Sequence, residues 1–322
     1  MNTLSVKLLI YLFISFSITD TYSQDSKVLE YLYKISGGKI MAGQHNKEPN
    51  SDPDKWTEYI KETTDKYPAL WSGDFLFQKD DIDNRWIMIH EAREQWNNGA
   101  IINLMWHGCP PDIGEPCEWD TGLLNAQLTD AQWNELLTPD SALYNKWISR
   151  MDDIAVYLQF LEDEGVEVLF RPFHEMNQGL FWWAGRPGPN GTAALYRLTH
   201  DYLTKTKGLS NLIWVWDMQD LSRDFEDYNP GDEYWDVFAF DIYDNGYDIS
   251  WYNYILPIVG DKPMAIGECS KVPSASVLEN QKRWVFFMPW AELVKESNTE
   301  EQIKEIYKHK SVITRDEMPG WN

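Results

Sequence analysis

Residues 166–175 read VEVLFRPFHE. The first part of this stretch is mostly apolar, as is typical of a short strand buried on both faces of a parallel sheet. It ends in His174 and Glu175, two side-chain types that take part in acid–base chemistry. The stretch therefore predicts a buried strand that carries reactive groups at its carboxyl end.

The same combination recurs along the chain. Short apolar runs occupy residues 39–45, 69–75, 100–107, 166–175, 212–217, 237–243, 263–268 and 284–290. Amphipathic stretches with helical spacing lie between them, at 84–97, at 142–164 and at 192–207, where Thr192 is the expected N-cap. Eight strands alternating with helices predict an α/β fold. Their number and the chain length favour a single-domain (β/α)₈ TIM barrel over a doubly wound sheet, for which no glycine-rich nucleotide motif is present.

The composition narrows the class of ligand. The 322 residues include 28 Lys and Arg against 51 Asp and Glu, a net charge of −23. This acidity argues against nucleic acid as a partner and against an anionic membrane surface. The 17 Trp, 17 Tyr and 13 Phe residues exceed what a core needs. Acidity and abundant tryptophan together favour a neutral ligand with apolar faces and hydroxyl groups, such as a sugar.

The N-terminus has the features of an export signal. Lys7 precedes an apolar run at residues 8–18, and Thr21 and Ser23 are the small residues expected before a cleavage site at Gln24. We therefore predict a cleaved signal peptide at 1–23 and a catalytic barrel domain at 24–322. The alternative is a membrane anchor, but the run is shorter than the roughly 20 residues that a span needs. With no cysteine near the cut to suggest a lipoprotein, we expect a secreted or periplasmic protein that is a monomer and is not inserted in a membrane.

The three cysteines have different expected roles. Cys109 and Cys117 lie in one proline-rich loop, and export would permit a disulfide between them, the alternative being two unrelated thiols. Cys269 follows an apolar run and is expected to be a buried thiol. No Cys or His cluster has zinc-ligand spacing, so no metal is expected.

Nearly every apolar run ends in a polar, reactive residue: His45, Asp74, His107, Glu175, Asp217, Tyr243 and Glu268. The carboxyl ends of barrel strands converge on one face, where barrel enzymes keep their active sites. Glu175 ends the fourth strand and Glu268 the seventh, which face each other across the barrel. Carboxylates about 5–5.5 Å apart can flank a glycosidic bond in a retaining mechanism. The alternative is that each glutamate is a solvated loop end or an ion-pair partner.

The surroundings of the two glutamates predict different roles. Glu175 precedes the aromatic residues 181–183, and burial against them would raise its pKa, as a general acid requires. Arg171 and Tyr243 are the expected hydrogen-bond donors that keep Glu268 ionised. Gly267 is expected to leave room for the sugar to approach.

Residues 171–177 (RPFHEMN), followed by 181–183 (FWW), resemble the acid/base signature of glycoside hydrolase family 26. Residues 38–45, 106–107, 240–243 and 266–268 are similar to its first, third, sixth and seventh strand ends, so the resemblance covers roughly residues 36–310. It implies a retaining endo-β-1,4-mannanase that hydrolyses β-mannan, galactomannan or glucomannan through a covalent glycosyl-enzyme intermediate. It implies no cofactor.

The resemblance also implies roles for individual residues. Glu175 would be the proton donor and Glu268 the nucleophile. Trp290 would lie under the sugar before the cleaved bond, with the other substrate contacts coming from His107, Trp119, His174, Trp182, Trp183 and Tyr243, and with support from Arg171 and Asp241. The chain departs from the family pattern at Leu180, where many members have a tryptophan.

Two alternative functions remain at this point. The same machinery could act as a β-1,3-1,4-glucanase, a β-1,3-xylanase or a mannobiose-releasing exo-mannanase. A non-catalytic glycan-binding barrel is the alternative from another class, and it would be expected to have lost one of the two glutamates. Both are present.

Overall fold

The computed structural model describes residues 26–243 and 246–321. The predicted signal peptide therefore lies outside the described residues. Eight parallel strands form a closed barrel in chain order, with β1 pairing both β8 and β2. The strands are β1 (Ile40–His45), β2 (Leu70–Asp74), β3 (Ile101–Met105), β4 (Val168–Arg171), β5 (Leu212–Gln219), β6 (Val237–Ile242), β7 (Met264–Cys269) and β8 (Trp284–Pro289). The predicted (β/α)₈ barrel is confirmed.

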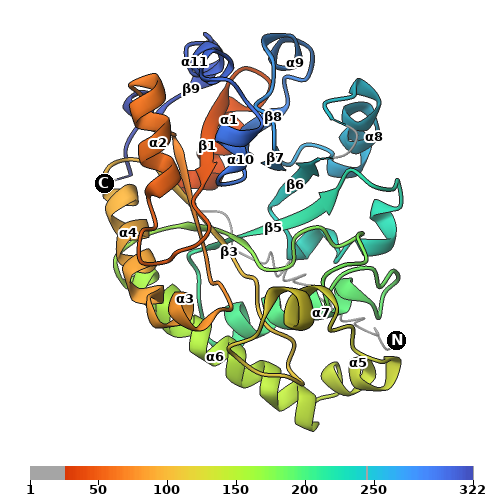
Figure 1. Ribbon diagram of the computed structural model, residues 1–322. Coiled ribbons are helices and arrows are strands. Elements are labelled where there is room, and N and C mark those ends of the chain that lie inside the picture. Colours follow the sequence, from red (N-terminus) through yellow and green to blue (C-terminus); the bar gives the residue numbers. More distant parts are fainter. Residues whose placement is uncertain (1–25, 244–245, 322) are drawn as a thin grey trace, which may run out of the picture.

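Helices surround the barrel (Figure 1). The α-helices are α1 (Lys27–Ile35), α2 (Lys55–Thr64), α3 (Lys79–Asp83), α4 (Arg85–Asn97), α5 (Asp130–Leu136), α6 (Ala142–Asp163), α7 (Thr192–Asp201), α8 (Ile249–Val259), α9 (Ala275–Asn280), α10 (Leu293–Glu296) and α11 (Glu300–Tyr307). Shorter turns are η1 (Trp119–Leu124), η2 (Tyr202–Thr206), η3 (Phe225–Tyr228), η4 (Asp232–Tyr234) and η5 (Arg315–Glu317). A two-residue strand, β9 (Val312–Ile313), pairs with β1 outside the barrel. Among the described helices, none combines the length and apolarity needed to cross a membrane.

Burial explains the apolar runs. Every residue of the barrel strands is buried except Gln219 at the end of β5, because the strands carry the interior layers on one side and the helices on the other. Trp106, just after β3, stacks on Trp147 of α6 with ring centroids 4.9 Å apart. Much of the tryptophan content thus serves helix–barrel packing.

The helix after β4 differs from its prediction. Thr192 is the first residue of α7 rather than its cap, and its hydroxyl donates to the carbonyl of Trp183 at 2.6 Å. Gly191 takes the cap position, where a Cβ would lie 1.8 Å from the carbonyl oxygen of Arg186. The α-helix ends at Asp201 and the wider turn η2 continues it to Thr206.

Candidate active site

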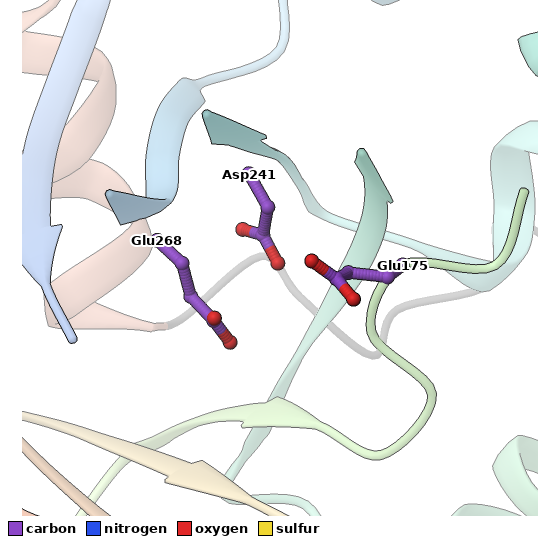
Figure 2. Close-up of side chains that lie close together, drawn as sticks. All are labelled: Glu175, Asp241 and Glu268. Carbon is purple, nitrogen blue, oxygen red and sulfur yellow. The ribbon is translucent and has the colours of Figure 1, made fainter. Parts of the chain in front are cut away.

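The carboxyl ends of the strands bring together three acidic side chains from distant parts of the sequence. Glu175 follows β4, Asp241 belongs to β6 and Glu268 to β7. Figure 2 shows their carboxylates turned toward one another, and an oxygen from each lies within 4.8 Å of the others. All three side chains are buried. The structure thus pairs the two glutamates across the barrel, as predicted, and adds Asp241 beside them.

Arg171 and Tyr243, the predicted hydrogen-bond donors, each contact one carboxylate oxygen of Glu268. The Arg171 guanidinium donates to Oε1 through Nη2, and the Tyr243 hydroxyl donates to Oε2 at 2.7 Å. Nη1 of Arg171 donates to Asp241 Oδ1 at 2.9 Å and also to Asp217. A single cation is therefore shared by three carboxylates, and Glu268 is oriented from both sides.

The two glutamates differ in how strongly their surroundings raise the pKa. Burial, and then the charge of Glu268, raise the pKa of Glu175 well above its ordinary value. Burial also raises the pKa of Glu268, but Arg171 and the Tyr243 hydrogen bond oppose the rise. Glu268 is therefore the first of the pair to lose its proton, and Glu175 is the one that retains it. This is the division needed between a nucleophile and a general acid.

The backbone at Glu175 adopts an unusual conformation. Its φ is 52°, in the left-handed region that costs energy for a residue other than glycine. The backbone N–H of Glu175 donates to Asp217 Oδ1 at 2.8 Å, and the Gln178 amide donates to its Oε2, also at 2.8 Å. Asp217 therefore stabilises the turn that carries Glu175, while its other oxygen contacts Arg171, which orients Glu268.

These supporting roles of Asp217 and Gln178 have little local signal in the sequence. Asp217 was identified as a strand end, yet its partners come from β4 and the turn after it, which only the closed barrel brings near. Gln178 was missed altogether. The one available signal was its position three residues after Glu175, where a turn can return a side chain to its own start.

Replacing Glu175 by glutamine is expected to stabilise the protein increasingly as the pH rises. A carboxyl group whose pKa is raised by folding costs no stability below its unfolded value, here about 4.5, and costs more as the pH increases above it. The gain in Tm of Glu175→Gln over the wild type should therefore be small below about pH 4.5 and grow toward neutral pH. Thermal unfolding across this range measures it. A gain that does not change with pH would contradict the raised pKa.

Gly267 has a different role from the one expected. A Cβ at this position would lie 2.6 Å from Asp241 Oδ1 and 2.8 Å from Asp217 Oδ2. The space beside the glycine is thus occupied by the carboxylates around Arg171. The prediction that Gly267 leaves room for a sugar is therefore wrong, because the absent side chain makes room for the acidic cluster instead.

Two histidines stand beside the carboxylates. His107 and His174 are both buried and their rings meet edge to face with centroids 4.5 Å apart. Burial lowers the pKa of His174 well below its ordinary value, so this ring is neutral.

Trp119 lies 6.0 Å from His107 between ring centroids and is 40% exposed, so it has surface available for a ligand. Leu180 is 58% exposed where the family pattern has tryptophan.

The two tryptophans of the FWW motif serve the scaffold. Trp182 is fully buried, its indole N–H donates to the Gly108 carbonyl at 2.8 Å, and its ring packs against Trp147. Having no exposed surface, Trp182 packs rather than contacting a sugar, which corrects the predicted role. Trp183 is 1% exposed, and its indole N–H donates to the His174 carbonyl at 3.0 Å. It therefore stabilises the turn that carries His174 and Glu175.

The loop after β3 is closed by a disulfide between Cys109 and Cys117. The Arg150 guanidinium donates to the Cys109 carbonyl at 2.8 Å, and the backbone N–H of Cys117 donates to the Phe77 carbonyl at 3.1 Å. These contacts fix the loop that leads into Trp119. Cys269, by contrast, is a buried free thiol, as predicted.

Glu175, Asp241 and Glu268 also offer oxygen ligands of the kind that bind a divalent cation. The Arg171 guanidinium already contacts Asp241 and Glu268 and supplies positive charge to both. The cluster is thus better suited to an acid–nucleophile pair than to a metal centre.

A separate cavity of about 630 Å³ lies near the amino ends of the strands. It lies between α1, η2 and η4 and is lined by Tyr33, Trp214, Tyr234, Asp236 and Lys262, among others. None of the predicted site residues lines it.

Comparisons with known proteins agree with the fold and show the family. The family model for glycosyl hydrolase family 26 matches residues 19–317. A mannan endo-1,4-beta-mannosidase of Thermothelomyces thermophilus is 33% identical over 306 residues, covering 91% of this chain and 61% of that protein. This chain therefore spans about three fifths of that relative's length.

Two solved structures are similar throughout. The structure of GH26A from Muricauda sp. superposes with a TM-score of 0.88 at 33% identity, covering 92% of this chain and 99% of that one. A beta-mannanase from a symbiotic protist of the termite Reticulitermes speratus, complexed with gluco-manno-oligosaccharide, gives 0.80 at 27% identity over 92% and 94% of the two chains. By its sequence, its barrel and its paired glutamates, this chain belongs to glycosyl hydrolase family 26.

Proposed function

We propose that the protein is a retaining endo-β-1,4-mannanase. The observation that carries this proposal is the pairing of Glu175 and Glu268, whose nearest oxygens lie within 4.8 Å of each other and of which Glu175 has the more strongly raised pKa. Retaining glycosidases hold their two carboxyl groups about 5–5.5 Å apart, which leaves no room for a water molecule between the sugar and the nucleophile.

The reaction takes place in two steps. Glu268 attacks the anomeric carbon while Glu175 donates its proton to the leaving oxygen, which breaks the glycosidic bond and forms a glycosyl ester with Glu268. Glu175, now ionised, then takes a proton from water as the water attacks the same carbon and releases Glu268. Arg171 and Tyr243 hold Glu268 in line for both steps through their hydrogen bonds.

β-Mannan is the substrate that the comparisons favour. The relative from Thermothelomyces thermophilus is named a mannan endo-1,4-beta-mannosidase, and the protist beta-mannanase was crystallised with gluco-manno-oligosaccharide. The glucanase, xylanase and exo-mannanase alternatives have no such support. A non-catalytic glycan-binding role would leave the Arg171 cluster around Glu268 without a purpose.

A panel of polysaccharides tests the proposal. Galactomannan, glucomannan, lichenan and β-1,3-xylan are incubated with the protein, and the products are resolved by size and, for the first product, by anomeric configuration. We expect mixed-length oligosaccharides with β-configured ends from the two mannans. Activity on none of the four would refute the hydrolase, and a dominant disaccharide from the start would refute the endo mode.

We also propose that the protein is exported, with cleavage after Ser23, and that it acts as a monomer. The apolar run at residues 8–18 supports export. The disulfide between Cys109 and Cys117 suits an oxidising compartment outside the cytosol. N-terminal sequencing of the exported protein tests the cut, and light scattering in solution tests the monomer.

A further inference from the structure

Asp74, at the end of β2, holds His107 by two hydrogen bonds. Its Oδ2 lies 2.6 Å from Nδ1 of the ring, and its Oδ1 accepts from the backbone N–H of His107 at 3.2 Å. Burial alone would raise the pKa of Asp74, but its contacts with His107 lower it below the ordinary value. Asp74 is therefore an ionised carboxylate, which can only accept hydrogen bonds, so Nδ1 of His107 must carry the proton.

When the His107 ring carries a single proton, its other nitrogen is thereby left as an acceptor. In a neutral imidazole one nitrogen donates and the other accepts, and the partner of the first determines the role of the second. Within residues 26–243 and 246–321, Nε2 of His107 makes no hydrogen bond. It is available to accept from a hydroxyl group of a ligand.

His45, at the end of β1, completes the arrangement. Its Nδ1 lies 2.8 Å from the Ser72 hydroxyl, which also accepts from the Asn103 amide at 2.8 Å. With Asn103 as its donor, Ser72 can give its own proton to Nδ1 of His45. The ring proton of His45 then lies on Nε2, which is 3.9 Å from the same Oδ2 of Asp74. Burial lowers the pKa of His45 to about 3, so the ring is neutral.

The same histidine supports an aromatic ring of the site. The rings of His45 and Trp290 stack with centroids 4.1 Å apart and planes 20° apart. Trp290 in turn lies 5.9 Å from His107 between ring centroids. His45 thus covers one face of Trp290 while its Nε2 approaches Asp74, so both ligand-facing residues depend on the ends of β1 and β2.

We propose that Asp74 is a positioning residue that makes His107 a hydrogen-bond acceptor for a sugar hydroxyl, and that His45 fixes the Trp290 ring beside it. This inference rests on the proposed function and adds to it how the subsite recognises its sugar. His107 selects a hydroxyl that donates, and Trp290 supplies the apolar face.

Nitrogen NMR of histidine-labelled protein tests the inference without any activity measurement. In the wild type, the ¹⁵N shifts and proton couplings of His107 should assign the proton to Nδ1. In Asp74→Asn, Oδ1 can still accept from the His107 backbone, which turns the amide N–H toward the ring and should move the proton to Nε2. A wild-type proton on Nε2, or no change in the variant, would overturn the proposal.

Kinetics on a manno-oligosaccharide provides the functional test. Asp74→Asn should raise KM about tenfold, the effect of one lost hydrogen bond, with a smaller change in kcat. In a His107→Gln background the same substitution should add nothing. An equal effect in that background would overturn the proposal, because Asp74 would then act through the fold and not through His107.

Asp201→Asn is the matched control, since Asp201 lies 3.0 Å from Nδ1 of His200 in a similar pair on α7, outside the site. It should leave KM unchanged. If the wild type hydrolyses none of the polysaccharides, the proposed function fails, but the NMR experiment still decides whether Asp74 sets the protonation of His107.

Discussion

Replacing Glu268 by alanine is expected to lower kcat on β-mannan by on the order of 10⁵-fold, the scale of losing a catalytic nucleophile. Glu268 is held by Arg171 on one oxygen and by the Tyr243 hydroxyl on the other, and both contacts orient its carboxylate for attack. The loss should appear in kcat and not in KM, because the carboxylate acts on the anomeric carbon only as the bond breaks.

Azide distinguishes a lost nucleophile from a misfolded variant. A small anion can enter the space left by Glu268→Ala and attack the anomeric carbon directly, which yields a glycosyl azide of inverted, α configuration. Glu279→Ala, on the exposed side of α9, serves as the control and should retain full activity. Near-normal hydrolysis by Glu268→Ala would remove Glu268 from the mechanism.

Replacing Glu175 by alanine is expected to lower kcat/KM on β-mannan by about 10²–10⁴-fold, the usual contribution of a general acid. The effect should depend on the leaving group. The sugar oxygen that leaves during mannan cleavage needs a proton to depart, whereas a dinitrophenolate does not. A dinitrophenyl β-mannobioside should therefore still form the intermediate. Without Glu175 to activate water, that intermediate should accumulate and give a burst of released phenol.

The acid/base variant also has its own azide product and pH dependence. Azide should speed turnover of the intermediate and yield a β-configured glycosyl azide, opposite to the Glu268 variant.

In the wild type, activity should fall as the pH rises through the raised pKa of Glu175, and this basic limb should disappear in Glu175→Ala on the activated substrate. Equal losses on both substrates would contradict the acid/base assignment.

Much of the fold could be predicted because strands and helices leave local patterns in a sequence. The apolar runs around residues 100–107 and 166–175 became β3 and β4, and the predicted helix at 142–164 became Ala142–Asp163. The helix after β4 was less accurate. Its start depends on the Trp183 carbonyl that binds the Thr192 hydroxyl, a tertiary contact with no local signal.

The sequence by itself determined the barrel and the two paired glutamates, because these follow from hydrophobic periodicity and from the residues that end the strands. The family was indicated by a resemblance, which residues 171–177 and 181–183 carry. Only the tertiary structure decided that Trp182 packs against Trp147, that Gly267 makes room for Asp217 and Asp241, and that Asp74 holds His107. Each of these depends on side-chain direction and on partners from other strands. Backbone periodicity indicates which face a strand buries, but hydrogen bonds and packing across the closed barrel decide what each buried side chain contacts.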